Sequence, residues 1–166
     1  MPLLIQMPGV EPRRAPGLTT LVDLPATVLD LAGVDAPPGV AGRSLVPLLR
    51  GETDEHRKLV VSGWPLEYQK GRITIAVDSW PRRIARDQPL TVTTRELSLV
   101  VGGADDDLEL YDLGDDPGEQ RNVATERAGE AAALVEEALA ELVSIGASAE
   151  LLAPRRGALE RFCTTV

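Results

Sequence analysis

Short apolar stretches separated by glycine and proline recur between residues 57 and 113, and they constrain the fold more than any other feature of the chain. Residues 73–77, Ile-Thr-Ile-Ala-Val, alternate as expected of a strand with one buried face. Successive short strands joined by turns favour an antiparallel meander over crossover connections. The other candidate strands are Leu59–Val61, Leu90–Thr94, Leu97–Val101 and Leu108–Leu113.

An amphipathic helix is predicted from about Glu126 to Ile145, followed by a tail at 146–166 with a short apolar-basic stretch. Apolar residues recur every three or four positions on one face, and glutamates occupy the others. We expect this helix to pack on the sheet. The alternative is a coiled-coil seam, although all-acidic flanks offer no complementary charge pairing. The apolar face consists of Ala128, Ala131, Val135, Ala138, Leu142 and Ile145.

The first part of the chain, about residues 1–51, mixes strand and helix signals. The run Leu3–Ile5 is apolar throughout, which predicts a strand covered on both faces, as in a parallel sheet. A short helix is predicted after Asp23, a plausible cap, and it should stop at Gly33. Residues 42–51 give a brief apolar segment, so this part resembles the last elements of an α/β layer.

The chain has 166 residues and a net charge of −9, with 17 basic and 26 acidic residues. This length suits one domain, and the acidic balance argues against nucleic acid and anionic membrane surfaces as partners. No apolar run approaches the roughly 18–20 residues that span a bilayer, and the first residues do not resemble a signal peptide. The sequence as given therefore predicts a soluble, cytoplasmic, acidic protein.

The chain contains one cysteine, Cys163, and one histidine, His56. A single cysteine excludes an internal disulfide framework and any zinc site with several cysteines. A single histidine excludes every catalytic mechanism that needs two histidines from this chain. Acids are concentrated between Asp105 and Glu119, but they lack the ligand spacing of a calcium loop, so we expect a solvated turn.

Four segments together carry a family resemblance. They are PLLIQMPG at 2–9, LVDLPATVLDLAGV at 21–34, GRSLVPLLRG at 42–51 and ELYDLGDDPGEQRNVA at 109–124. Their order and spacing resemble the C-terminal third of sulfatases of the alkaline-phosphatase superfamily, over residues 2–145 with a weak match between 57 and 90. One departure is that Pro25 precedes Ala26, whereas the family usually has proline directly before the threonine.

The resemblance implies an α/β fold class, with α+β character in the larger part. Residues 1–51 would supply the last strand and helix of an alkaline-phosphatase-like α/β domain. Residues 57–145 would form a small antiparallel sheet with a packed C-terminal helix, and 146–166 would be a tail.

The resemblance also implies chemistry that this chain cannot supply by itself. Family sulfatases hydrolyse sulfate esters with a formylglycine matured within a Cys/Ser-x-Pro-x-Arg motif, and a divalent cation, usually calcium, polarises the sulfate. Here Cys163 is followed by Thr-Thr-Val. The family's late metal-binding segment precedes the strand that would begin at residue 2. We therefore expect no catalytic residue, metal ligand or cofactor in this chain, and no activity from it alone.

Loops of the family's C-terminal part border the substrate pocket. The candidates for such contacts are His56, Trp64, Tyr68, Arg82 and Arg83. Two arginines could attract an anionic substrate. Ordinary surface exposure is the alternative for these residues, and it is favoured for Arg82, for Arg83 and for His56 in its charged loop.

Two function classes remain open. The chain is a C-terminal fragment or subunit of a sulfatase-like hydrolase, or it is a noncatalytic binding or assembly module derived from that fold. Because the opening strand has no early partner in the chain, we expect self-association or a partner such as the N-terminal catalytic part.

Overall fold

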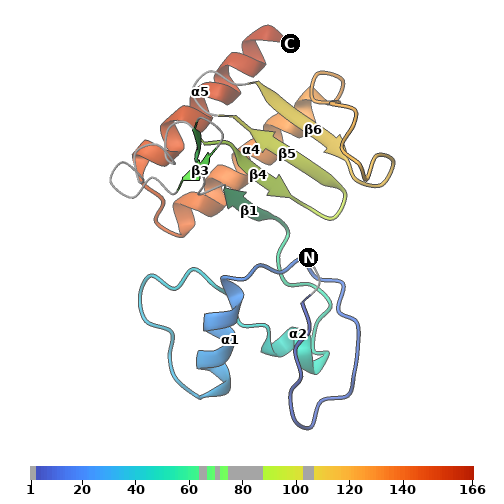
Figure 1. The fold of residues 1–166 in the computed structure, drawn as a ribbon, viewed down its shortest axis with the longest axis vertical. Coiled ribbons are helices and arrows are strands. Elements are labelled where there is room, and N and C mark those ends of the chain that lie inside the picture. The colour runs from blue at the N-terminus through green and yellow to red at the C-terminus, as the bar shows by residue number, and fades with distance from the viewer. Residues whose placement is uncertain (1–2, 64–66, 70–71, 75–87, 103–106) are drawn as a thin grey trace. The chain divides into compact units, whose positions relative to one another are not determined.

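The chain folds as two units, Met1–Lys58 (unit 1) and Leu59–Val166 (unit 2). The computed structural model describes residues 3–63, 67–69, 72–74, 88–102 and 107–166. Figure 1 shows helices and loop segments in unit 1 and a sheet with helices in unit 2. The mixed α/β class expected from the sequence is confirmed.

Unit 2 is built on a four-stranded antiparallel sheet in the order β1-β4-β5-β6 (Figure 1). The meander predicted from residues 57–113 is confirmed for these strands. A separate antiparallel pair consists of β2 and β3, and Ile75 and Val77 of the predicted alternation lie outside the described residues. The strands are β1 Val60–Gly63, β2 Glu67–Gln69, β3 Arg72–Thr74, β4 Leu90–Thr93, β5 Leu97–Val101 and β6 Leu108–Asp112.

The core of unit 2 lies between this sheet and two helices, α4 (Ala128–Ser144) and α5 (Ala149–Thr165). Val92, Leu99 and Leu110 are paired across three strands and form one buried row. Helix α4 contacts β4 and β5, so the expected packing of helix on sheet is confirmed. Its buried side chains recur at helical spacing: Ala131, Leu134, Val135, Ala138, Leu139 and Leu142.

Helix α5 occupies the segment for which the sequence predicted only a tail with a short apolar-basic stretch. Gly146, with a φ of 81°, lies between the two helices, and the Ser148 hydroxyl accepts a hydrogen bond from the Leu151 N–H at 3.3 Å. Leu152 and Ala158 are buried in the core of unit 2. This burial stabilises a helix whose internal Pro154 obscures the pattern in the sequence.

Asn122 covers the outer edge of β6. Its Oδ1 accepts hydrogen bonds from the N–H groups of Leu110 and Ala124 at 3.0 and 2.9 Å, and its Nδ2 donates to the Leu108 carbonyl at 3.3 Å. The Val123 N–H adds a main-chain bond to the Leu110 carbonyl at 2.8 Å. The edge strand is thereby closed against pairing with another chain.

Unit 1 contains α1 (Asp23–Leu31) and the short α2 (Val46–Arg50). The helix predicted after Asp23 is confirmed. The strand predicted at Leu3–Ile5 is wrong for this chain, since these residues form no strand. A strand needs a hydrogen-bonding neighbour, and no sheet forms among the described residues of unit 1. The buried hydrophobic residues of unit 1 are Ala26, Leu45, Val46 and Leu48.

The described helices include none long and apolar enough for a bilayer crossing; α4 and α5 have 17 residues each.

Candidate functional site

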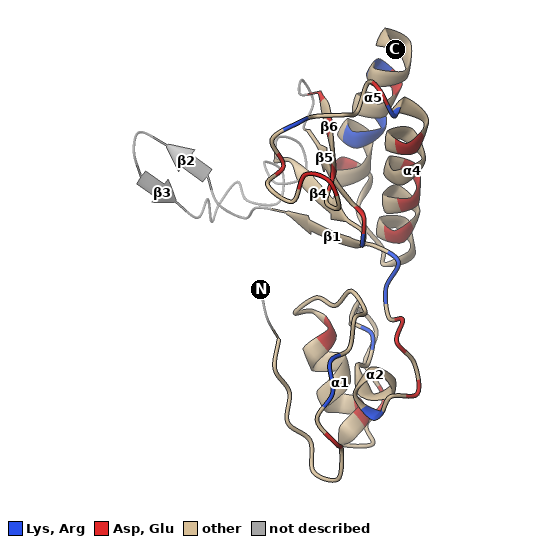
Figure 2. Ribbon diagram, turned by 90° about the vertical axis from the view of Figure 1, so that its right-hand side faces the viewer, with Lys and Arg blue, Asp and Glu red and all other residues tan. Residues whose placement is uncertain are grey.

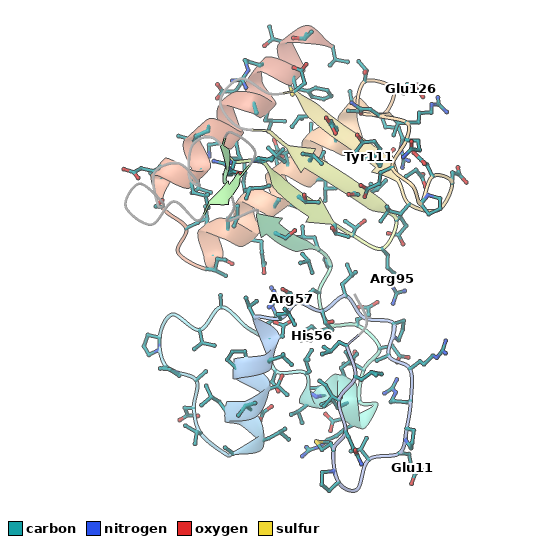
Figure 3. All side chains as sticks on the ribbon, in the orientation of Figure 1. Glu11, His56, Arg57, Arg95, Tyr111 and Glu126 are labelled. Atoms are coloured by element: carbon teal, nitrogen blue, oxygen red, sulfur yellow. The ribbon has the colours of Figure 1, made fainter. Side chains whose placement is uncertain are left out.

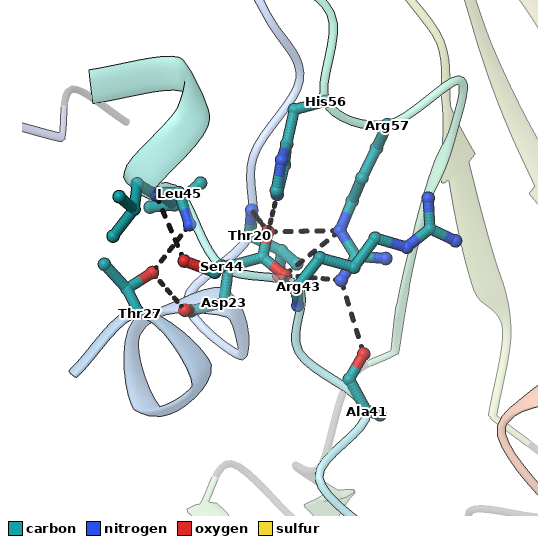
Figure 4. A network of polar contacts seen from close by, with 10 residues as sticks. Thr20, Asp23, Thr27, Ala41, Arg43, Ser44, Leu45, His56 and Arg57 are labelled. Carbon is teal, nitrogen blue, oxygen red and sulfur yellow. Dashed lines mark hydrogen bonds and ion pairs between the residues drawn. The ribbon is translucent and has the colours of Figure 1, made fainter. Parts of the chain in front are cut away.

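The strongest concentration of buried polar groups in unit 1 surrounds Asp23, the first residue of α1 (Figure 4). The residue is completely buried. Its Oδ2 accepts a hydrogen bond from the Thr20 N–H at 3.1 Å, and its Oδ1 accepts one from the Arg43 N–H at 2.9 Å. Asp23 therefore joins the segment before α1 to the segment before α2, instead of capping its own helix.

Arg57 and His56 complete the shell around this carboxylate (Figures 3 and 4). Arg57 Nε lies 3.2 and 3.1 Å from the two oxygens of Asp23, and Arg57 Nη2 also donates to Oδ1. His56 Nε2 lies 3.1 Å from Oδ2, and because an ionised carboxylate only accepts, this nitrogen is the donor. The side chains of Arg57 and His56 are each 7% exposed.

Opposing effects act on the acidity of Asp23. Burial raises the pKa of a carboxyl group, but hydrogen bonds from Arg57 and from the N–H groups of Arg43 and Thr20 outweigh it and lower the pKa of Asp23 to about 2. Asp23 is therefore an anion at neutral pH. The buried guanidinium of Arg57 has a charge partner as a result.

Helix α1 is tied to the residues before α2 by further side-chain bonds. The Thr27 hydroxyl donates to the Asp23 carbonyl at 2.7 Å and accepts from the Leu45 N–H at 2.9 Å. Ser44 Oγ bonds to the Asp30 carboxylate. Gly42 approaches the start of α1 so closely that a Cβ there would lie 2.0 Å from the Val22 carbonyl oxygen. We name Asp23, Thr27, Arg43, His56 and Arg57 the Asp23 cluster.

The chemistry available to the Asp23 cluster is that of a structural anchor. Both carboxylate oxygens are engaged by hydrogen bonds, which leaves Asp23 a poor general base. Within the described ranges, no three His, Cys, Asp or Glu side chains converge to hold a metal ion. The donor set of this part of the chain therefore does not fit the divalent cation that the family resemblance implies.

An open pocket of about 650 Å³ also lies in unit 1. Its charged groups include Arg13, but this guanidinium already donates to the Leu48 carbonyl at 3.2 Å and pairs with Asp54. The pocket therefore lacks a free cation at Arg13 for an anionic ligand. Its lining is Met7–Arg13, Leu31, Leu49 and Arg50.

Of the five substrate-contact candidates, His56 is the one whose side chain the structure describes. His56 belongs to the Asp23 cluster, where Asp23 fixes its orientation. The surface exposure expected for His56 is wrong, because its side chain is 7% exposed and contacts the buried Asp23 carboxylate. Tyr68 lies in β2, with its side chain outside the described part. Trp64, Arg82 and Arg83 lie outside the described residues. The role of these five residues as substrate contacts therefore stays a prediction.

Sequence reasoning missed Arg57 and gave Asp23 only a capping role. Their pairing joins residues 34 positions apart, and no local periodicity reports such a contact. The sequence does contain a signal for this site. Residues Asp54–Lys58, between two ordered parts of the chain, are a run of five charged or titratable residues that includes the only histidine.

The acidic residues after β6 form turns, as expected. Asp112 Oδ1 accepts from the N–H groups of Gly114 and Asp115 at 3.0 and 3.2 Å. Asp112 Oδ2 accepts from Arg127 Nη1 at 2.6 Å, and hydrogen bonds from Arg127 and these N–H groups lower the pKa of Asp112. The acids there thus hold the connection between β6 and α4.

The Tyr111 hydroxyl donates to Glu109 Oε2 at 2.6 Å within β6. This bond to the carboxylate raises the pKa of Tyr111 to about 12. The Tyr111 hydroxyl is therefore protonated at neutral pH and acts as a hydrogen-bond donor.

The protein family described as N-sulphoglucosamine sulphohydrolase, C-terminal, matches residues 1–145. The chain belongs to this family. The match contains the Asp23 cluster, all described strands and α4, whereas α5 follows it. The resemblance to the C-terminal region of sulfatases is thereby confirmed.

Curated relatives of this sulphohydrolase C-terminal region are sulfatases. The chain is 33% identical over 129 residues to a delta 4,5-hexuronate-2-O-sulfatase of Bacteroides thetaiotaomicron, covering 75% of this chain and 24% of that protein. It is 30% identical over 129 residues to arylsulfatase K of Mus musculus, covering 76% and 22%. The chain thus spans about a quarter of the length of these relatives.

Solved structures extend the likeness to a neighbouring hydrolase class. A phosphonate monoester hydrolase from Silicibacter pomeroyi superposes with a TM-score of 0.65 at 27% identity, over 84% of this chain and 28% of that one. A putative sulfatase from Bacteroides thetaiotaomicron superposes with a TM-score of 0.51 at 28% identity, over 74% and 24%. These likenesses support the alkaline-phosphatase-like fold class predicted for the chain.

Proposed function

We propose that this chain serves as the C-terminal part of a sulfatase-like hydrolase acting on sulfuric or closely related esters, and that its 166 residues are catalytically silent alone. The observation that carries the proposal is the family match over residues 1–145, joined to relatives about four times the matched length. The chain would contribute structure to an active site built by other residues.

Two features of the chain support the proposal that it is catalytically silent alone. The carboxylate of Asp23, the one acid of the Asp23 cluster, is occupied by hydrogen bonds that stabilise unit 1. The one thiol, Cys163, is followed by Thr164, Thr165 and Val166, without the proline and arginine of the nucleophile motif that the resemblance implies. Neither group is arranged for nucleophilic attack.

The direct test measures hydrolysis of a nitrophenyl sulfate and a nitrophenyl phosphonate monoester by the purified chain, with and without added calcium. We expect no turnover above buffer. Turnover by the purified chain would overturn the proposed silence.

A second test addresses the hydrolase itself. The DNA immediately upstream of the Met1 codon should encode, in phase or in an adjacent frame, an acidic pair and a Cys-x-Pro-x-Arg motif. A stop codon and ribosome-binding site with no such neighbour would instead support the noncatalytic binding or assembly module.

A further inference from the structure

The two units are joined through Lys58, an exposed residue whose chain neighbours are fixed in different units. Before it, Arg57 pairs with Asp23 in unit 1, and its side chain is 7% exposed. After it, Leu59 is 8% exposed in the core of unit 2, and Val60 already pairs with β4. The chain therefore passes from an anchored residue of unit 1 to an anchored residue of unit 2 with one residue between them.

Arg57 is held in unit 1 by its side chain and by its backbone. Its Nε lies 3.2 and 3.1 Å from the two carboxylate oxygens of Asp23, and its Nη2 also donates to the Ala41 carbonyl at 3.4 Å (Figure 4). An isolated β-bridge joins its backbone to Leu18. The chain entering Lys58 is thus fixed for as long as the Asp23 cluster is intact.

The strand that follows this connection is an edge strand. Strand β1 lies at one end of the sheet order, and β4 is its one neighbour among the described strands. It has four residues, of which Ser62 and Gly63 are exposed. The chain enters β1 directly from the charged run 54–58, coloured red and blue in Figure 2. Short edge strands open more readily than the centre of a sheet, so an anchor at the start of β1 affects its opening.

The physical link between anchor and strand is backbone entropy. When β1 separates from β4, the freedom that it gains depends on how firmly the preceding residue is held. With Arg57 fixed, one intervening residue allows β1 few open conformations. Fixing backbone is the main cost of ordering a chain, so an anchor that restricts the open state favours the paired strand.

We propose that the Asp23 cluster is a conformational coupling device: through the one-residue connection at Lys58, the Asp23–Arg57 pair sets how often β1 opens from β4. Opening of β1 exposes the N–H and C=O groups of β4, which are a template for pairing with another chain. The state of the Asp23 cluster in unit 1 thereby controls a sheet edge in unit 2. This inference concerns the chain's own conformations, and it stands or falls independently of the proposed hydrolase function.

The test lengthens the connection without altering the Asp23 cluster. Three glycines are inserted between Lys58 and Leu59 of the 166-residue chain, and amide hydrogen exchange is followed by mass spectrometry. Peptides containing β1 should exchange about tenfold faster, whereas peptides from residues 20–50 and from β6 should be unchanged. The matched control inserts three glycines between Pro38 and Gly39, in an exposed turn of unit 1, and should leave β1 exchange unchanged.

Arg57→Met completes the test by removing the anchor instead of the connection. In the unaltered chain it should speed exchange in β1 about tenfold as well. In the chain with three glycines after Lys58 it should speed exchange in residues 20–50 and leave β1 where the insertion put it, because the lengthened connection no longer transmits the anchor. Unchanged β1 exchange after the Lys58 insertion would overturn the coupling. Equal acceleration by the two insertions, or equal acceleration in β6 and β1, would overturn it too.

Discussion

Removing the carboxylate of Asp23 should destabilise unit 1 more than any other single substitution in α1. Asp23 is completely buried and is the charge partner of Arg57, whose side chain is 7% exposed. Asp23→Ala would leave that guanidinium buried without an anion, which typically costs about 3–5 kcal/mol. Since a whole domain is stable by only about 5–15 kcal/mol, we expect unit 1 to open locally.

Amide hydrogen exchange followed by mass spectrometry measures this effect separately for the two units. Peptides from residues 20–50 should lose protection by about 100-fold to several thousand-fold, and peptides from α4 should be unchanged. Asp30→Ala is the matched control, because Asp30 lies in the same helix but is exposed and bonds only to a hydroxyl. We expect it to cost no more than about 1 kcal/mol.

A compensating substitution sharpens the test. Replacing both members of a buried ion pair with apolar residues is often tolerated, so Asp23→Leu with Arg57→Met should recover part of the protection lost in Asp23→Ala. A loss in Asp23→Ala no greater than that in Asp30→Ala would refute the reasoning, since it would show that the Arg57 charge is not held by Asp23.

Three further effects are expected. The folded-state pKa of Asp23, about 2, lies below its ordinary 3.8. The ionised carboxylate therefore contributes about 2 kcal/mol of stability, which is fully present above pH 3.8 and is lost as the pH falls through about 2. The stability difference between the unmodified chain and Asp23→Asn should therefore shrink with acidification in urea titrations, and a constant difference would contradict this. Gly42→Ala should cost about 1–3 kcal/mol in thermal unfolding because its Cβ would meet the Val22 carbonyl at 2.0 Å. Gly129→Ala, where a Cβ meets nothing within 4 Å, should be neutral or stabilising; equal effects of the two would argue against the close contact. Asn122→Ala should cost about 2–3 kcal/mol and speed amide exchange in β6, and unchanged exchange there would show that the edge needs no cover.

The elements that could be predicted from the sequence are those whose pattern is local. The helices near Asp23–Leu31 and Ala128–Ser144 follow from apolar spacing, with a glycine stop for the first, and the strands of the four-stranded sheet follow from short apolar runs between turn residues. Each of these signals is contained within one element, so a single sequence is enough to show it.

The features that could not be predicted depend on contacts distant in sequence. The Asp23–Arg57 pair joins residues 34 positions apart, and α5 is stabilised by burial of Leu152 and Ala158 although Pro154 lies within it. Leu3–Ile5 has strand composition, but composition cannot supply the neighbouring strand that a sheet requires. The sequence shows what a segment prefers, whereas its final state depends on which partners it meets.

Hydrolysis of an aryl sulfate tests the central proposal most directly when the purified 166-residue chain is compared with the protein captured from a native extract of its source cells. We predict no turnover by the purified chain and measurable turnover by the captured protein. Turnover by the purified chain, or none by the captured protein, would contradict the proposal that this chain is the silent C-terminal part of a sulfatase-like hydrolase.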